Sequence, residues 1–227
     1  MYPLEIKPNV FWAGVIDWTL RDFHGYSTEK GSTYNAFIAK GTDKTVLFDT
    51  AKATYTDELL RRVREIMDPS EIDYIVVNHA EMDHTGSLPT MVEAIRPEKI
   101  FMSKPCLDAV TAHFGPRDWP VQVVSTGDEL QLGGKTVTFI EARMLHWPDS
   151  MFSYIREDRL FVTSDGFGQH YATSERFDDE VDLGEAMHQA AKYYANILLP
   201  YSPMMVKALD QIERLGLDID MIAPDHG

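Results

Sequence analysis

The feature that most constrains this fold is a cluster of ionisable side chains placed directly after a buried strand. Residues 73–77 form a short apolar segment that runs straight into NHAEMDH at positions 78–84. This segment places His79, Glu81, Asp83 and His84 within six residues. Loops that follow strands are where protein sites are usually built. The chain must therefore bury this strand in a sheet and open its carboxyl end to a site.

Three more ligand-type residues follow apolar, strand-like segments later in the chain. They are His146 in MLHWPDS, Asp165 in VTSDGFG and His226 in IAPDHG. Taken singly, each is most often a turn residue or a satisfied hydrogen-bonding group. The cluster of four is different, because packing His79, Glu81, Asp83 and His84 together without a cation would leave like carboxylates adjacent and poorly solvated. Carboxylates and neutral imidazoles are metal ligands, so the set predicts a metal site.

Hydrophobic patterning predicts a layered α/β protein with mixed sheets, because hairpins stand beside strand–helix units throughout the chain. Ser87 is a candidate cap for the second helix. No linker rich in Gly, Pro or Ser divides the chain, which favours one domain over residues 1–227. The expected strands are 10–16, 34–40, 45–49, 73–77, 99–102, 121–124, 129–132, 136–141, 151–155, 160–163 and 218–223, and the expected helices are 57–67, 87–95, 105–114, 185–199 and 204–215.

Composition excludes several classes of protein. The formal charge of −15 repels a phosphate backbone, which argues against nucleic acid as a partner. No apolar run approaches the roughly 20 residues that span a bilayer, and the N-terminus lacks the pattern of a signal peptide. Cys106 is the single cysteine, so the chain forms no internal disulfide. A cytoplasmic location fits this cysteine usage.

The spacing of the ligand-type residues resembles that of the metallo-β-lactamase fold, whose usual motif is His-x-His-x-Asp-His followed by a distant His, Asp and His. Glu81 stands where that motif has its second His. With this replacement the chain is similar to the flavodiiron proteins, also called rubredoxin:oxygen oxidoreductases, from Val10 to Gly227. The resemblance implies an αββα sandwich with two mixed β-sheets flanked by helices.

The resemblance also implies a non-haem diiron site. One iron would be held by His79, Glu81 and His146. The other would be held by Asp83 and His226, with Asp165 bridging the two. His84 is variable in the family and either ligates the second iron or turns away.

Other histidines and one tyrosine have weaker claims. His24, His170 and Tyr193 are candidates for places beside the ligands, with packing or surface placement as the alternative. His113 and His188 fall in predicted helices, where a structural or exposed position is expected.

Glu81 indicates redox chemistry through its charge. Three carboxylates carry −3 against +4 for two divalent ions, so one bridging hydroxide would balance the site. Anionic oxygen donors favour iron in its higher oxidation state. Zinc has no redox chemistry and needs only a polarised water.

By the resemblance, such a chain reduces dioxygen to water, nitric oxide to nitrous oxide, or both. Electrons would come from FMN in a flavodoxin-like domain, which this chain does not contain. A head-to-tail homodimer and a donor such as rubredoxin are implied. The missing domain leaves two interpretations, a portion of a longer protein or a short protein served by a separate flavoprotein. Two other functions stay open: a dinuclear zinc hydrolase of the same fold, and an interaction domain without metals.

Overall fold

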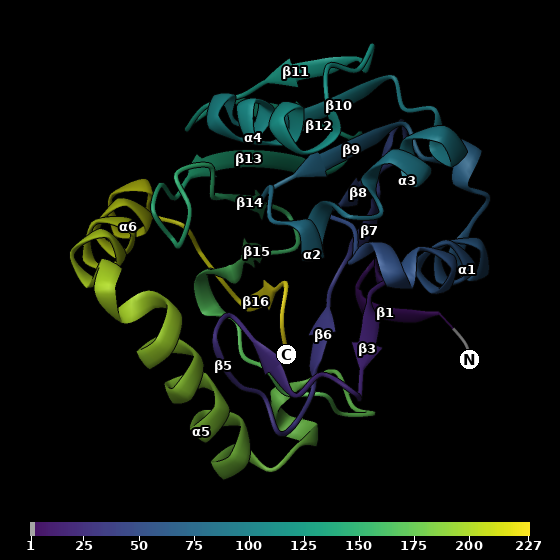
Figure 1. Ribbon diagram of the computed structural model, residues 1–227. Coiled ribbons are helices and arrows are strands. Elements are labelled where there is room, and N and C mark those ends of the chain that lie inside the picture. The colour runs from purple at the N-terminus through teal and green to yellow at the C-terminus, as the bar shows by residue number, and fades with distance from the viewer. Residues whose placement is uncertain (1–2) are drawn as a thin grey trace.

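Two mixed β-sheets pack face to face and are flanked by helices in this computed structural model, which describes residues 3–227 (Figure 1). In the first sheet, β1, β2, β7 and β8 pair antiparallel in that order. From β8 onward, β9, β10 and β11 are added in parallel. Its order is β1 (Leu4–Lys7), β2 (Val10–Trp12), β7 (Phe37–Lys40), β8 (Thr45–Phe48), β9 (Tyr74–Val77), β10 (Lys99–Met102) and β11 (Val121–Val123).

The second sheet contains five strands and is also mixed. Its first four strands pair antiparallel, and the last one joins β15 in parallel. Its order is β12 (Glu129–Gln131), β13 (Thr136–Glu141), β14 (Met151–Ile155), β15 (Leu160–Ser164) and β16 (Met221–Pro224). Two small sheets accompany them: β3 (Val15–Asp17) with β6 (Ser32–Tyr34), and β4 (Asp22–Phe23) with β5 (Tyr26–Ser27).

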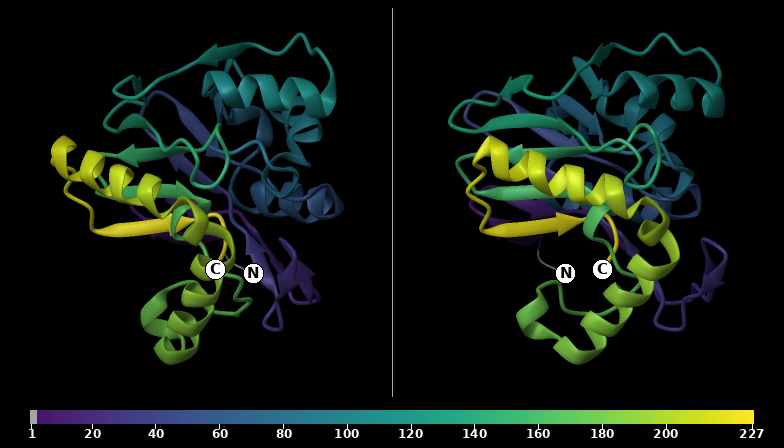
Figure 2. Two further views of the ribbon diagram at one scale, coloured as in Figure 1. Left: turned by 60° about the vertical axis from the view of Figure 1, so that its left-hand side comes forward. Right: turned by 90° about the vertical axis from the view of Figure 1, so that its left-hand side faces the viewer.

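Helices cover the outer faces of both large sheets (Figure 2). Helices α1 (Thr56–Ile66), α3 (Leu88–Ile95) and α4 (Lys104–Phe114) lie on the first sheet, and α6 (Ser202–Leu215) lies on the second. Helix α5 (Leu183–Tyr193) extends beyond the sheets, and the single turn α2 (Met82–Thr85) follows β9. The remaining turns are η1 (Ala53–Tyr55), η2 (Pro69–Glu71), η3 (Asp165–Phe167), η4 (Asp178–Glu180), the π-helical η5 (Tyr194–Leu198) and η6 (Leu199–Tyr201).

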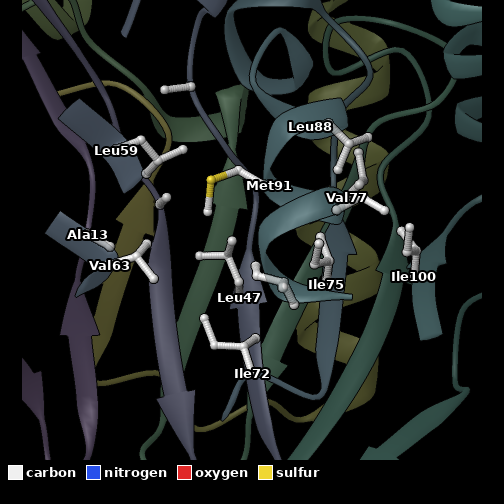
Figure 3. Packing of buried hydrophobic residues seen from close by; sticks show 14 of the residues in the cluster. Ala13, Leu47, Leu59, Val63, Ile72, Ile75, Val77, Leu88, Met91 and Ile100 are labelled. Carbon is white, nitrogen blue, oxygen red and sulfur yellow. The ribbon is translucent and has the colours of Figure 1, made fainter. Parts of the chain in front are cut away.

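The alternation of side chains along the central strands builds the layers. Leu47 of β8 points into the core under α1 and α3, whereas its neighbours Val46 and Phe48 point between the sheets. Successive strand residues face opposite sides, so a fully apolar strand can serve two cores at once. Figure 3 shows Leu47 and Ile75 beside Leu59 and other residues of this outer cluster.

The αββα sandwich expected from the sequence is confirmed, and most predicted elements lie within a few residues of their expected bounds. The single strand expected over 10–16 is wrong, because the chain breaks into β2 and β3 at Gly14. A Cβ there would lie 2.6 Å from the Tyr34 carbonyl oxygen, so only glycine permits this close crossing of two chain segments.

Two further expectations need correction. Ser87 stands at the start of α3, but its hydroxyl bonds Lys52 and Thr56 instead of capping the helix. The helix expected over 185–199 begins earlier, at Leu183, and changes to a π-helical turn after Tyr193. Across the described residues, no helix combines the length and the apolar character that crossing a membrane requires.

Candidate metal centre

One edge of the sandwich collects the ends of four strands. Strand β9 ends there and leads to His79, while β15 and β16 run parallel and lead to Asp165 and His226. Strand β13 is antiparallel to β14, as β14 is to β15, so β13 also ends at this edge and leads to the loop that carries His146. Residues separated by about 150 positions in sequence therefore converge.

A first group of donor atoms forms around Glu81. Its Oε2 lies 3.1 Å from Nε2 of His146 and 3.3 Å from Nε2 of His79. Glu81 stands immediately before α2, and this turn directs its side chain toward the loop that carries His146. Three donor atoms thus face a common point.

A second group forms around Asp83, within helix α2. Its Oδ2 lies 3.1 Å from Nε2 of His226 and 3.4 Å from Nε2 of His84. All three side chains are buried. His84, whose orientation the sequence left open, therefore points its Nε2 into the same group.

Asp165 lies between the two groups and offers one oxygen to each. Its Oδ2 is 3.1 Å from Nε2 of His146, whereas its Oδ1 is 3.1 Å from Nε2 of His84 and 3.4 Å from Nε2 of His226. A carboxylate divided in this way can bridge two cations.

The opposite ring nitrogen of three histidines is held by the surrounding protein. Nδ1 of His79 lies 3.1 Å from Asp149 Oδ2, and Nδ1 of His226 donates to the Thr33 carbonyl oxygen at 2.6 Å. Nδ1 of His84 faces Asp225 at 3.5 Å. Such partners fix the ring so that Nε2 is free to bind a metal.

Several donor atoms of the second group, and one oxygen of Asp165, are buried and lack hydrogen-bond partners within residues 3–227. These atoms are both oxygens of Asp83, Nε2 of His84, Oδ1 of Asp165 and Nε2 of His226. Buried polar groups without partners are costly, and native proteins contain few of them. A cation at the second group would satisfy these atoms. The donors of the first group converge in the same way on one point, so the residues fit a metal pair.

The electrostatics of the metal-free chain support the same interpretation. Burial works against the charged form of Asp165, yet His84 and His226 hold the pKa of its carboxyl well below the usual range. Burial likewise opposes protonation of His79, but hydrogen bonds to Asp149 and Glu81 raise its pKa to about 10. Protons and metals compete for the same atoms, so metal binding would release protons.

His24, His170 and Tyr193 lie beside the two groups. His24 Nε2 lies 3.3 Å from Glu81 Oε1, and the His170 ring packs edge-on against Tyr193 with centroids 5.1 Å apart. The Tyr193 hydroxyl is buried and has no partner in the described part of the chain. By contrast, His113 and His188 are exposed on α4 and α5.

Sequence reasoning missed three buried residues that support the site. They are Asp149, Asp225 and Ser32. Asp225 precedes His226 directly and Asp149 follows His146 by three positions, so adjacency to a ligand-type residue was a usable signal for both. Ser32 stands in β6, far from any ligand in sequence, and only the folded chain reveals it.

The fold and the donor set define a metallo-β-lactamase-like protein with places for two metal ions. Residues 33–227 match the family described as ODP family beta lactamase. The chain belongs to this family, and the resemblance to flavodiiron proteins is confirmed by its relatives.

Two relatives show the match along the sequence. The chain is 48% identical over 228 residues to a rubredoxin-oxygen oxidoreductase of Megalodesulfovibrio gigas, covering 100% of this chain and 56% of the relative. It is 46% identical over 227 residues to a nitric oxide reductase of Moorella thermoacetica, covering 99% of this chain and 57% of the relative. The chain thus spans little more than half the length of these relatives.

Solved structures agree. The rubredoxin oxygen:oxidoreductase from Desulfovibrio gigas superposes with a TM-score of 0.96 at 46% identity, covering 99% of this chain and 56% of that one. The flavodiiron protein from Giardia intestinalis superposes with a TM-score of 0.94 at 36% identity, covering 100% of this chain and 55% of that one.

Proposed function

We propose that this chain is the diiron oxidoreductase domain of a flavodiiron protein. It would reduce dioxygen to water, nitric oxide to nitrous oxide, or both. His79, Glu81 and His146 would hold one iron, and Asp83, His84 and His226 the other. Asp165 would bridge the two ions, and residues 1–227 would make up this one domain.

The divided carboxylate of Asp165 carries the proposal. Its two oxygens face two separate groups of donors at 3.1 Å each, which a single-ion site does not need. Glu81 adds a second anionic oxygen to the first group, where His79 and His146 supply nitrogen. This mixture of hard oxygen and imidazole donors suits iron.

Iron held by these residues would supply electrons for the reduction of a small molecule. Residues of the chain itself would bind and orient that molecule. Tyr193 keeps its proton, because burial and the nearby Asp165 and Asp83 raise the pKa of its hydroxyl well above the usual value. Its unpartnered O–H is thus available as a hydrogen-bond donor to the bound molecule.

The electron source and the assembly belong to the same proposal. FMN in a flavodoxin-like domain outside this chain would supply the electrons, and a rubredoxin or similar protein would reduce the flavin. The relatives' names support this, since one is a rubredoxin-oxygen oxidoreductase. We also propose a head-to-tail homodimer, which would bring one subunit's flavin to the other's metals, and a cytoplasmic location, as the cysteine usage suggests.

Anaerobic purification followed by metal analysis and gas consumption tests the proposal. The chain should retain about two iron ions and consume dioxygen or nitric oxide when a reduced flavodoxin is supplied. Comparing the two gases at equal concentration identifies the preferred substrate. Asp165→Ala should lose both iron and consumption, whereas Asp210→Ala, an exposed carboxylate on α6, should retain both.

The competing function is a dinuclear zinc hydrolase of the same fold. Recovery of two zinc ions without reducible iron, together with cleavage of a thioester or phosphoester, would overturn the proposal in favour of that enzyme. Glu81 is the residue that argues against it.

A further inference from the structure

A chain of hydrogen bonds links Ser32 to Glu81 through two histidines that come from separate parts of the fold. Ser32 Oγ lies 2.7 Å from His170 Nδ1, His170 Nε2 lies 3.3 Å from His24 Nδ1, and His24 Nε2 lies 3.3 Å from Glu81 Oε1. Ser32 opens β6, His24 stands at the β4–β5 turn, and His170 follows η3. Figure 1 shows β6 near the C-terminal end of the chain after β16, where Asn35 N donates to the Asp225 carbonyl oxygen.

Donor and acceptor chemistry allows one direction for this series of hydrogen bonds. A carboxylate only accepts, so His24 Nε2 must carry the hydrogen. With that hydrogen on Nε2, the His24 ring presents Nδ1 as the acceptor, and His170 donates to it from Nε2. His170 Nδ1 accepts in turn, and the Ser32 hydroxyl donates to it. One tautomer for each histidine satisfies every contact.

The neutral state of His170 is consistent with its surroundings. Burial, together with the neighbouring His226 and His24, lowers its pKa to about 2. The Ser32 hydroxyl also lies 3.2 Å from the Thr33 carbonyl oxygen and 3.3 Å from His226 Nδ1. That nitrogen donates to the Thr33 carbonyl oxygen at 2.6 Å, so it is no acceptor, and the carbonyl oxygen is already bonded. The shorter contact to His170 is therefore the better use of the Ser32 proton.

We propose that Ser32, His170 and His24 are positioning residues that hold Glu81 by Oε1, so that only Oε2 serves as a metal donor. Oε2 is the oxygen that lies near Nε2 of both His79 and His146. A hydrogen bond from His24 to Oε1 favours binding of the ion through Oε2 alone, which leaves a place for a small molecule beside the first ion. This inference rests on the proposed two-metal site and adds the device that shapes it.

His24 has an alternative role that the geometry must be tested against. One ring nitrogen of His24 and one donor atom each from Glu81, His146 and Asp165 all lie within 4.8 Å of one another. If His24 bound metal directly, its Nε2 would carry no hydrogen and could not donate to Glu81. The tautomer and the number of imidazoles at the metal therefore distinguish the two roles.

Zinc-loaded protein gives a diamagnetic test that does not depend on activity. Nitrogen-15 correlation spectra should show both His24 and His170 as the Nε2–H tautomer, and Ser32→Ala should broaden or mix the His170 signals. His24→Leu should weaken zinc at one of the two positions by roughly 10–100-fold. His24→Gln, whose amide can donate, should restore most of that affinity. His188→Leu on α5 serves as the exposed control.

The outcomes separate this inference from the proposed function. Two zinc ions bound with unchanged affinity in His24→Leu, or an Nδ1–H tautomer for His24, would overturn the positioning role while leaving the two-metal site standing. X-ray absorption that shows one imidazole fewer in His24→Gln would overturn it in favour of direct ligation. Wild-type protein that binds no pair of ions would overturn both.

Discussion

Among single residues, Asp165 has the widest expected influence, because its two oxygens face both donor groups. His146 contributes to one group only, and its side chain is 12% exposed, whereas that of Asp165 is fully buried. Removing the Asp165 side chain should therefore weaken metal binding at both donor groups, and removing the His146 side chain should weaken it at one.

Metal counting tests this difference. We expect wild-type protein to bind about two zinc ions, Asp165→Ala to bind neither tightly, and His146→Ala to keep about one. Equilibrium dialysis followed by elemental analysis gives the counts, with Asp210→Ala as the matched carboxylate control. Equal losses in the Asp165 and His146 variants would contradict a bridging position for Asp165.

The buried phenol of Tyr34 should make the stability of the folded state depend on pH in the alkaline range. Burial, followed by the nearby Asp17, raises the pKa of its phenol, and its hydroxyl donates to Asp17 Oδ2 at 3.1 Å. The folded state therefore keeps this proton above pH 10, where an unfolded tyrosine loses it. Since the unfolded state then binds fewer protons, stability should fall as pH rises above about 10.

Denaturant titrations of wild-type and Tyr34→Phe protein at pH 7 and at higher pH measure this effect. The variant should be less stable at pH 7 by about 1 kcal/mol, the usual net contribution of a hydrogen bond. Its stability should decline less steeply above pH 10. Parallel pH profiles for the two proteins would show that Tyr34 does not contribute.

At the scale of elements, the two large sheets are tied together by their turns. The turn between β7 and β8 donates from Thr42 N to the Gly133 carbonyl oxygen and from Asp43 N to the Leu132 carbonyl oxygen, at 2.8 Å and 3.0 Å. Gly41 makes this contact possible, since a Cβ there would lie 1.8 Å from the Leu132 carbonyl oxygen.

Substituting Gly41 should therefore separate the turns. Gly41→Ala is expected to cost at least about 3 kcal/mol, the upper end of overpacking effects, because the obstacle is backbone. Gly134→Ala is the matched control. Its φ is +71° and no atom lies within 4 Å of an added Cβ, so only the left-handed backbone conformation should lower the stability, by about 1–2 kcal/mol. Urea midpoints give both values, and a cost for Gly41→Ala no larger than the control would refute the tie.

At the scale of the whole molecule, the metal centre joins segments from both sheets. Helix α2 follows the first sheet, while Asp165 and His226 follow β15 and β16 of the second. Ions that bind only the folded chain stabilise it, by about 2.7 kcal/mol when free metal is at 100 times the dissociation constant.

Thermal unfolding with and without metal tests this coupling. Zinc should raise the midpoint and a chelator should reverse the rise, because the unpartnered carboxylates and imidazoles then face one another again. Asp165→Ala should lose most of the increase. A midpoint that zinc leaves unchanged in wild-type protein would mean that the donor groups do not bind it.

The sequence by itself determined the ligand-type residues and their strand contexts. His79, Glu81 and Asp83 follow an apolar strand, and hydrophobic patterning predicted a layered α/β protein with mixed sheets. The family and its αββα fold came from the resemblance that the ligand-type residues carry. This worked because strand patterning and the order of ligand types are local properties that a linear sequence records.

Tertiary structure alone decided how those residues meet. The parallel pairing of β15 and β16 brings His226 beside Asp165, and the turn at α2 separates Glu81 from Asp83 so that they face different groups. Ser32 supports the site from β6, over 130 residues from its partner His170. Contacts of this kind depend on which strands become neighbours, and neighbours are set by the packing of two sheets, which no local pattern encodes.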